Sequence, residues 1–225
     1  MIKKKKLKVI DLFSGVGGLS YGFACDDNFE IIAANEILPN IAKAYSLNHP
    51  AVKMYAEDIT NFNAQKIKKD LNIKAGEVEI IVAGPPCQAY STVGKRLAND
   101  PRGKLFKEYY RVLKEFNPKF FIFENVRGLL SIQGGELFKT IISCFESLGY
   151  KVQYKLLNAA DYGAPQIRER VMIIGSKLKT DFEEAGSLDK EKISKRISLI
   201  KSMIKSGTRP EWMFLTRIPV IPPEN

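Results

Sequence analysis

Cys87 stands in a context that favours a nucleophile. It follows Gly84-Pro85-Pro86, directly after the apolar run 79–83, and the two prolines restrict the backbone and hold the thiol away from regular packing. Nearby cationic groups would favour the reactive thiolate. The ordinary alternative is a small core residue. We expect that role for Cys25 and Cys144, which fall inside amphipathic stretches.

A carboxyl group follows a second apolar run. The sequence Phe120-Phe121-Ile122-Phe123 leads into Glu124-Asn125-Val126. At the end of so apolar a strand, we expect Glu124 to be partly desolvated, which favours its protonated form and suits a general acid. The alternative is a carboxylate that only caps the turn at Arg127-Gly128.

Two arginines alternate near the end of the ordered pattern. In Gln166-Ile167-Arg168-Glu169-Arg170, a spacing of two directs Gln166, Arg168 and Arg170 to the same side if the segment is extended. Two guanidinium groups on one side indicate an anionic or carbonyl partner. An ordinary solvated strand edge is the alternative.

The first apolar run leads into a glycine-rich turn. In Asp11-Leu12-Phe13-Ser14-Gly15-Val16-Gly17-Gly18, bare backbone would let a ligand approach the start of a helix. A dinucleotide fingerprint needs a third glycine where this chain has Ser20, so the reading as an NAD or FAD site fails. Glu36, 19 residues beyond Gly17, could bind ribose hydroxyls. Asp58 could accept from an adenine amino group or serve as a helix N-cap.

Strand-like and helix-like segments alternate along the chain. The predicted strands are 7–13, 29–34, 52–55, 79–83, 119–124, 150–157 and 171–175. The predicted helices are 17–24, 37–47, 64–71, 104–116 and 136–148. This alternation predicts an α/β protein with a mostly parallel sheet covered on both faces, with ligands bound beyond the carboxyl ends of the strands.

Composition narrows the class of protein. The 225 residues include 35 Lys+Arg and 25 Asp+Glu, a net charge of +10. The basic excess is +6 over 84–176 and only +1 over 1–83, which is typical of a polyanionic partner for the middle of the chain, with an ordinary solvated surface as the alternative. No apolar run approaches the roughly 20 residues of a membrane helix. Three cysteines without a Cys-x-x-Cys pair indicate a reducing compartment, and the lone His49 cannot by itself complete a zinc site.

Together these motifs resemble the ordered motifs of the DNA (cytosine-5)-methyltransferases. The resemblance spans residues 7–175 and rests on Asp11 to Gly18, Glu36, Asp58, Pro85-Pro86-Cys87-Gln88, Glu124-Asn125-Val126 and Gln166-x-Arg168-x-Arg170 in this order. It implies a Rossmann-like S-adenosylmethionine-dependent methyltransferase fold with a mostly parallel seven-stranded sheet. We therefore expect a catalytic domain at 1–176 and a helical, Pro-rich extension at 177–225, a candidate partner-binding segment.

The resemblance also implies the cofactor and its binding residues. S-adenosylmethionine would be the methyl donor, S-adenosylhomocysteine the product, and no metal would be needed. The expected cofactor residues are Phe13, Gly15, Val16 and Gly18 around the methionine and adenosine, Glu36 on the ribose, Ile37 against the adenine, Asp58 and Ile59 at its edge, and Pro86 and Leu105 to complete the pocket.

A reaction on a cytosine flipped out of duplex DNA is implied as well. Cys87 would attack carbon-6, Glu124 would hold and protonate ring nitrogen 3, and Arg170, supported by Arg168, would contact the carbonyl oxygen. Segment 91–104, with Lys95, Arg96 and Arg102, matches the loop that closes over DNA. Such a protein would be cytoplasmic and associated with a prokaryotic nucleoid.

The chain departs from the family at its far end. Members usually continue into a target-recognition domain and two further motifs, one of which contains a Gly-Asn pair that this sequence lacks. We expect a split enzyme whose second polypeptide supplies these parts, or a truncated chain. A tRNA cytosine-5 methyltransferase, and a cofactor-binding subunit without complete catalytic function, are the alternative functions.

Overall fold

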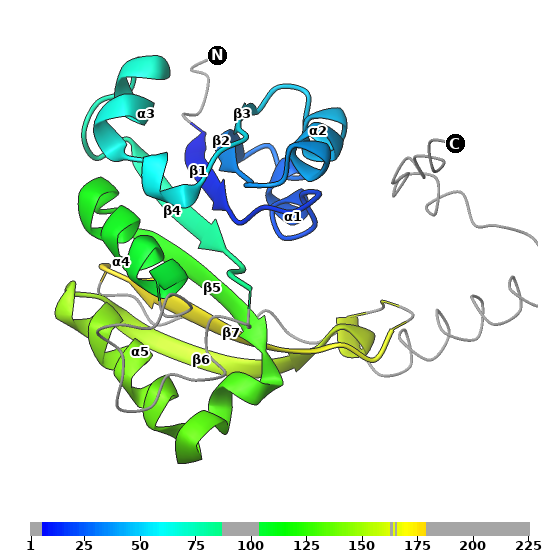
Figure 1. The fold of residues 1–225 in the computed structure, drawn as a ribbon, viewed down its shortest axis with the longest axis vertical. Coiled ribbons are helices and arrows are strands. Elements are labelled where there is room, and N and C mark those ends of the chain that lie inside the picture. Colours follow the sequence, from blue (N-terminus) through cyan, green and yellow to red (C-terminus); the bar gives the residue numbers. More distant parts are fainter. Residues whose placement is uncertain (1–5, 87–103, 163, 165, 179–225) are drawn as a thin grey trace, which may run out of the picture. The chain divides into compact units, whose positions relative to one another are not determined.

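The seven predicted strands form one sheet. The computed structural model describes residues 6–86, 104–162, 164 and 166–178. The strands are β1 (Leu7–Leu12), β2 (Phe29–Asn35), β3 (Lys53–Tyr55), β4 (Val78–Ala83), β5 (Phe120–Val126), β6 (Lys151–Asn158) and β7 (Glu169–Ser176). Their order across the sheet is β3-β2-β1-β4-β5-β7-β6, so the predicted α/β architecture is confirmed (Figure 1).

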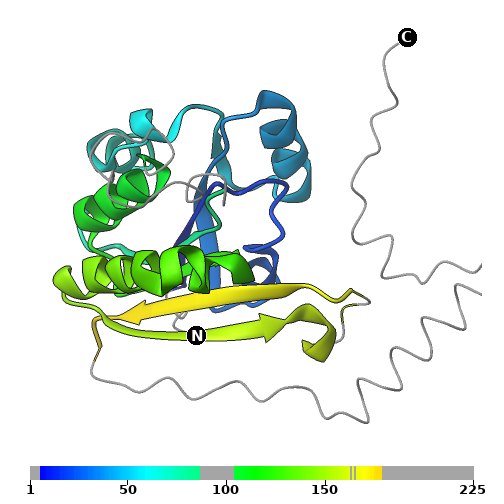
Figure 2. The same ribbon diagram turned by 60° about the horizontal axis from the view of Figure 1, so that its bottom comes forward.

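The order in which the chain adds strands to the sheet changes side at β1, although the strands there remain parallel. The pairings of β1 with β2 and β4, of β2 with β3, and of β4 with β5 are all parallel. Figure 2 shows β6 and β7 running in opposite directions, which leaves the sheet mostly parallel. The chain moves outward from β1 to β3 and returns to β4 on the other side of β1. In open α/β sheets, ligands bind in a crevice at such a switch point, which is expected here beyond the paired residues Leu12 and Ala83 at the carboxyl ends of the strands.

Helices cover both faces of the parallel strands. They are α1 (Tyr21–Ala24), α2 (Pro39–Asn48), α3 (Ala64–Asp70), α4 (Lys104–Phe116) and α5 (Glu136–Ser147). Figure 2 shows α3 and α4 on one side of the strands and α2 on the other. Local sequence sets where α2 and α3 begin. Pro39 occupies the first turn of α2. The Asn63 side chain accepts from Lys66 N at 2.9 Å and so caps α3. All six residues of β4 are buried, as a central parallel strand requires.

The first helix is shorter than the sequence pattern predicts. We expect a helix over 17–24, but α1 covers only Tyr21–Ala24. Gly17 has a φ of +95°, a left-handed conformation that a continuous helix cannot contain. A Cβ there would lie 2.2 Å from His49 Nε2, so the packing of the histidine ring also requires glycine. The glycine turn therefore leads into a single helical turn.

The expectation of a buried core position is wrong for Cys25. This residue is exposed and stands at the C-cap of α1, a helix without buried residues. Its amphipathic pattern lies in a segment too short to form a buried face. Cys144, in α5, is half-buried, and partial burial raises the pKa of its thiol.

An aromatic cluster joins β5 to α4 and α5. Phe121 and Phe123 of β5 pack against Tyr109 of α4 and Phe145 of α5, and all four side chains are fully buried. The Phe121 and Phe145 ring centroids are 4.4 Å apart. The Tyr109 hydroxyl also donates to Ile122 O at 3.3 Å. These contacts fix the strand whose end carries Glu124.

The chain divides into two compact units. Of the described residues, the first contains 6–86, 104–155 and 171–178, and the second contains 156–162, 164 and 166–170. Within the second unit, Ala159 N donates to Arg168 O at 3.0 Å. The predicted loop residues 91–103 and the predicted extension from 179 onward lie outside the described residues. In the part that the structure describes, we find no helix with the length and apolar character of a membrane span.

A test of the β5 packing is available at Gly175 of β7. A Cβ at this position would lie 1.9 Å from Phe121 Cε1. Because the ring is fixed by the aromatic cluster, we expect Gly175→Ala to lower the free energy of unfolding by about 1–3 kcal/mol, measured by urea denaturation. Gly22→Ala is the control, since a Cβ there meets no atom within 4 Å. Equal stabilities for the two variants would contradict this packing.

Candidate active site

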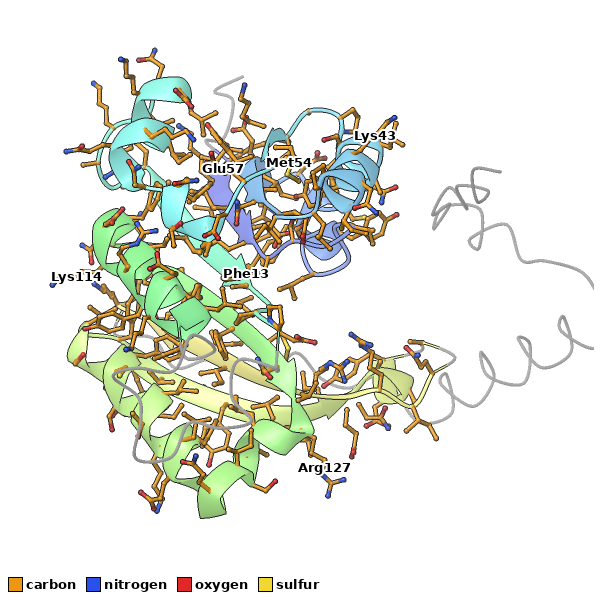
Figure 3. All side chains as sticks on the ribbon, viewed as in Figure 1. Phe13, Lys43, Met54, Glu57, Lys114 and Arg127 are labelled. Atoms are coloured by element: carbon orange, nitrogen blue, oxygen red, sulfur yellow. The ribbon has the colours of Figure 1, made fainter. Side chains whose placement is uncertain are left out.

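The turn after β1 holds the backbone open toward the crevice. Phe13, Gly15 and Gly17 all have positive φ, at 53°, 54° and 95°. The turn is tied down by Ser14 N, which donates to Asn35 O at 3.0 Å, and by Gly17 N, which donates to Ser14 O at 2.9 Å. A Cβ added at Gly15 would meet nothing within 4 Å. Figure 3 shows Phe13 at this turn. The backbone is therefore accessible to a ligand.

Glu36 binds the glycine turn from the end of β2. Its Oε2 accepts from Gly15 N and its Oε1 from Leu38 N, both at 3.0 Å. Hydrogen bonds to an ionised carboxylate are stronger than neutral ones, so this side chain fixes the turn relative to the start of α2. The adjacent Ile37 is 57% exposed. The structure thus brings together three predicted cofactor residues, Gly15, Glu36 and Ile37.

The loop after β3 is positioned by Asn35, the last residue of β2. Its Nδ2 donates to Tyr55 O at 3.1 Å and to Glu57 O at 2.8 Å. Asp58 Oδ1 in turn accepts from Thr60 N and Thr60 Oγ1, each at 2.8 Å. The N-cap alternative for Asp58 is therefore confirmed, because it begins the short helix η1 (Ile59–Asn61). Its role at an adenine remains a prediction.

Arg111 of α4 also binds the loop that follows β3. Its Nη2 donates to Ile59 O at 3.0 Å and to Phe62 O at 2.9 Å, while its other nitrogens bind Glu108 and Glu115 at 2.7 Å. The Ile59 side chain is only 3% exposed. Ile59 therefore anchors the loop in the core, and it offers a ligand backbone rather than side chain.

The ends of β4 and β5 meet beside the predicted nucleophile. Asn125 Nδ2 donates to Pro85 O at 3.1 Å, which fixes the segment that leads to Cys87. A Cβ added at Gly84 would lie 3.2 Å from Glu124 Oε2, so the glycine allows the carboxyl group to approach the backbone. Glu124 is half-buried, as expected for a carboxyl group at the end of an apolar strand. Cys87 itself lies outside the described residues.

The remaining predicted site residues that the structure describes differ in their exposure and contacts. Val16 and Leu105 are half-buried, whereas Gly18 and Pro86 are exposed. Arg168 and Arg170 belong to the second unit. There, Arg168 N donates to Asn158 Oδ1 at 3.0 Å, and Arg170 Nη1 donates to Glu169 O at 2.8 Å.

A buried polar cluster lies behind the glycine turn. Asp11 is fully buried, and neither carboxyl oxygen has a hydrogen-bond partner of good geometry among the described residues. The buried Ser14 hydroxyl is unpartnered in the same sense. Burial raises the pKa of Asp11 to about 7; the nearby Ser20 hydroxyl lowers it, and the charge of Glu36 raises it further.

Tyr45 and His49 of the α2 region complete this cluster. The Tyr45 and Ser20 hydroxyls are 3.3 Å apart, and the Tyr45 and His49 rings pack at 4.6 Å between centroids. Burial raises the pKa of Tyr45, and the charge of Asp11 adds to that effect. His49 Nε2 lies 3.3 Å from Gly17 O, and burial lowers the pKa of His49. The cluster thus supports the turn from the interior.

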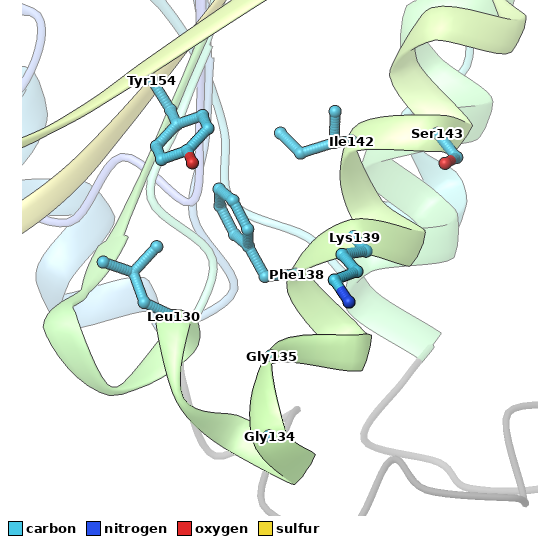
Figure 4. Close-up of a pocket in the computed structure, with 8 residues that line it drawn as sticks. All are labelled: Leu130, Gly134, Gly135, Phe138, Lys139, Ile142, Ser143 and Tyr154. Carbon is cyan, nitrogen blue, oxygen red and sulfur yellow. The ribbon is translucent and has the colours of Figure 1, made fainter.

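A separate surface hollow of about 600 Å³ lies beside α5. Its walls include Leu130, Ile142 and the rings of Phe138 and Tyr154, which meet edge to face (Figure 4). It contains none of the predicted catalytic or cofactor residues. The candidate active site is therefore the crevice at the strand ends and not this hollow.

Three positioning residues were missed by the sequence analysis. Asn35 and Asn125 each stand next to a site carboxylate at a strand end and fold back onto the neighbouring loop. A polar residue directly after an apolar run was the signal that could have identified both. Arg111 carried no such signal, because its position in an amphipathic helix does not reveal which loop it contacts.

The sequence matches a described protein family and several of its members. A family model described as C-5 cytosine-specific DNA methylase matches residues 7–215. The chain belongs to this family. It is 48% identical over 170 residues to the type II methyltransferase M.FnuDI of Fusobacterium nucleatum, covering 75% of this chain and 46% of the relative. It is 37% identical over 185 residues to M.AquIA of Picosynechococcus, covering 78% of this chain and 74% of the relative.

A solved structure agrees with the assigned family. A protein described as a prophage-encoded DNA modification methyltransferase of E. coli matches with a TM-score of 0.67 and 35% identity, over 79% of this chain and 49% of that one. The chain thus spans about half the length of several relatives that it matches.

The unpartnered carboxyl group of Asp11 makes stability depend on pH. Its pKa is about 7 in the folded chain against 3.8 as the reference value, so its contribution to stability is present at low pH and is lost as pH rises to about 7. Asp11→Asn mimics the neutral acid. We therefore expect this variant to gain about 3 kcal/mol of stability over wild type between pH 5 and pH 8.

Urea denaturation at both pH values measures this gain. Asp27→Asn is the matched control, because that carboxylate is fully exposed, and its difference from wild type should not change with pH. If Asp11→Asn destabilised the protein more at pH 8 than at pH 5, the carboxyl group would be charged and well partnered.

Proposed function

We propose that this chain is the cofactor-binding and catalytic part of an enzyme that methylates carbon-5 of cytosine in DNA. One observation carries the proposal. The ends of β4 and β5 bring Gly84 against the Glu124 carboxyl group and tie Pro85 to Asn125, at the same sheet edge as the Gly15–Glu36 contact. A nucleophile following Pro86 and a general acid would therefore act beside the cofactor turn.

The crevice fits S-adenosylmethionine. Open backbone at Gly15 and Gly18, the exposed Ile37 and the unpartnered polar atoms of Asp11 and Ser14 are features that a charged nucleoside ligand would use. The cofactor would supply an electrophilic methyl group and leave as S-adenosylhomocysteine. The proposed binding residues are Phe13, Gly15, Val16, Gly18, Glu36, Ile37, Asp58, Ile59, Pro86 and Leu105.

The chain's own groups would activate the target base. A cytosine in a duplex is inaccessible, so the base would be flipped out. The Cys87 thiolate would form a bond to carbon-6 while Glu124 gives a proton to ring nitrogen 3, so that charge does not accumulate on the ring. Carbon-5 would then be nucleophilic. After methylation, loss of the carbon-5 proton would break the bond from sulfur to carbon-6 and release Cys87.

Positively charged side chains would bind the base and the phosphate backbone of the DNA. Arg170, supported by Arg168, would hold the carbonyl oxygen of the base and stabilise the same electron shift. The +6 excess over 84–176 suits a phosphate backbone. Such an activity would operate on the nucleoid in the prokaryotic cytoplasm.

Target recognition would come from the part of the relatives that this chain does not span. Because the match covers 46% of M.FnuDI, the remaining half is available to choose the DNA sequence. We propose that a second polypeptide supplies this part. It would add base contacts and complete the cofactor pocket.

Replacement of the proposed nucleophile is the direct test of mechanism. Without a thiolate there is no covalent step, so we expect Cys87→Ser to lower methyl transfer from tritiated S-adenosylmethionine by about a thousand-fold or more. Glu124→Gln should lower it by about 10²–10⁴-fold. Cys144→Ser is the control and should keep full activity. Undiminished transfer by Cys87→Ser would refute the assignment, and preference for tRNA over duplex DNA would favour the alternative substrate.

A complementation experiment tests whether a second polypeptide supplies target recognition. The part of M.FnuDI that this chain does not match should restore sequence-selective methylation when mixed with the chain. The chain alone should bind cofactor with little selective transfer to DNA. Full, sequence-selective activity of the chain alone would contradict the need for a second polypeptide.

A further inference from the structure

Asp11 is a costly residue in its position. A buried carboxyl group that has no hydrogen bond of good geometry among the described residues loses its hydration, and the nearby Ser20 hydroxyl offsets this loss only in part, so the folded chain favours the neutral form. An amide would avoid the cost of ionisation, and an apolar side chain would avoid the loss of hydration as well. It stands on β1, two residues before the positive-φ turn at Phe13, at the strand end where the crevice opens. Its location therefore couples it to whatever binds at the turn.

Among the described residues, no positively charged group faces Asp11. The titratable groups that face it are Glu36 after β2 and Tyr45 of α2, with Ser20 before α1 as the nearby hydroxyl. His49 of the same cluster lies against Gly17 and Tyr45, and burial lowers its pKa, which favours the neutral ring. The strand residues paired with Asp11, Ala34 and Val82, are apolar. A positive charge arriving at the turn would thus be the first favourable partner for an Asp11 carboxylate.

We propose that Asp11 is a positioning residue that responds to the sulfonium charge of the cofactor, giving up a proton when the methyl donor binds and not when the product, whose sulfur carries no charge, binds. This inference rests on the proposed function. Opposite charges in a low-dielectric interior interact without direct contact, so burial of Asp11 strengthens the coupling. The carboxylate would favour S-adenosylmethionine over S-adenosylhomocysteine at higher pH, which assists exchange of product for donor.

The ratio of the two affinities isolates this effect. The ligands' own amino acid groups titrate in the same way whichever protein binds them, so the difference in this ratio between wild type and Asp11→Asn isolates the contribution of Asp11. A coupling that lowers the pKa of Asp11 by one unit makes the preference for the donor rise about fivefold between pH 6 and pH 8. Release of about half a proton near pH 6.5 should accompany binding of the donor.

Isothermal titration calorimetry of the full chain measures both quantities. Titrations of S-adenosylmethionine and S-adenosylhomocysteine in two buffers of different ionisation enthalpy, at pH 6 to 8, give affinities and proton release. Asp11→Asn should lose the fivefold rise in the ratio and the proton release that wild type shows in excess of the variant. Asp27→Asn, with its exposed carboxylate, should behave as wild type.

Ser20→Ala gives a second, milder variant. The Ser20 hydroxyl lowers the pKa of Asp11, so its removal should move the change in affinity ratio to higher pH without abolishing it. A ratio independent of pH in the wild type, or an unchanged pH dependence in Asp11→Asn, would overturn the proposal while leaving cofactor binding intact. Absence of binding by the wild type at every pH would overturn the proposed function and this inference with it.

Discussion

The candidate site depends on the hydrogen bonds that the Glu36 carboxylate accepts from Gly15 N and Leu38 N. The turn after β1 is not helical until Tyr21, so its backbone N–H groups need other acceptors. Glu36 satisfies Gly15 N and Leu38 N with one oxygen each, and so joins the ends of β1 and β2. A side chain that binds ribose hydroxyls would have to share these oxygens, each of which has a second lone pair. Ligand binding and the geometry of the turn are therefore linked through one residue.

The same design recurs at the next pair of strand ends. Asn125 binds Pro85 O much as Glu36 binds Gly15 N, so that a polar side chain at the end of one strand holds the loop that follows its neighbour. The aromatic cluster behind β5 keeps this arrangement rigid, because Phe121 and Phe123 have no space to move. Rigid strands with loops fastened at their ends provide the accuracy that a covalent mechanism requires.

Much of the fold could be predicted from the sequence. Apolar runs and turn residues located all seven strands, and residues at the ends of β1, β2, β4 and β5 indicated where chemistry would occur. The start of α1 could not be predicted, since it depends on the positive φ of Gly17 and the His49 ring behind it, 32 residues away. The exposure of Cys25 follows from that shortened helix. Arg111 was missed because its partners, Ile59 and Phe62, become neighbours only in the folded chain.

Asp11 shows what neither composition nor motif spacing can reveal. Its position in the glycine-turn motif is visible in the sequence, but its lack of a partner emerges only when Ser20 and Tyr45 are seen to bind each other. A fold stabilised by only several kcal/mol carries an unsatisfied carboxyl group at appreciable cost. Because replacement by a neutral residue would relieve that cost, retention of an ionisable group is more simply explained by a role in binding than by stability. On the proposed function, Asp11 and the glycine turn would both belong to the cofactor site, with Asp11 behind the turn and the open backbone of the turn toward the ligand.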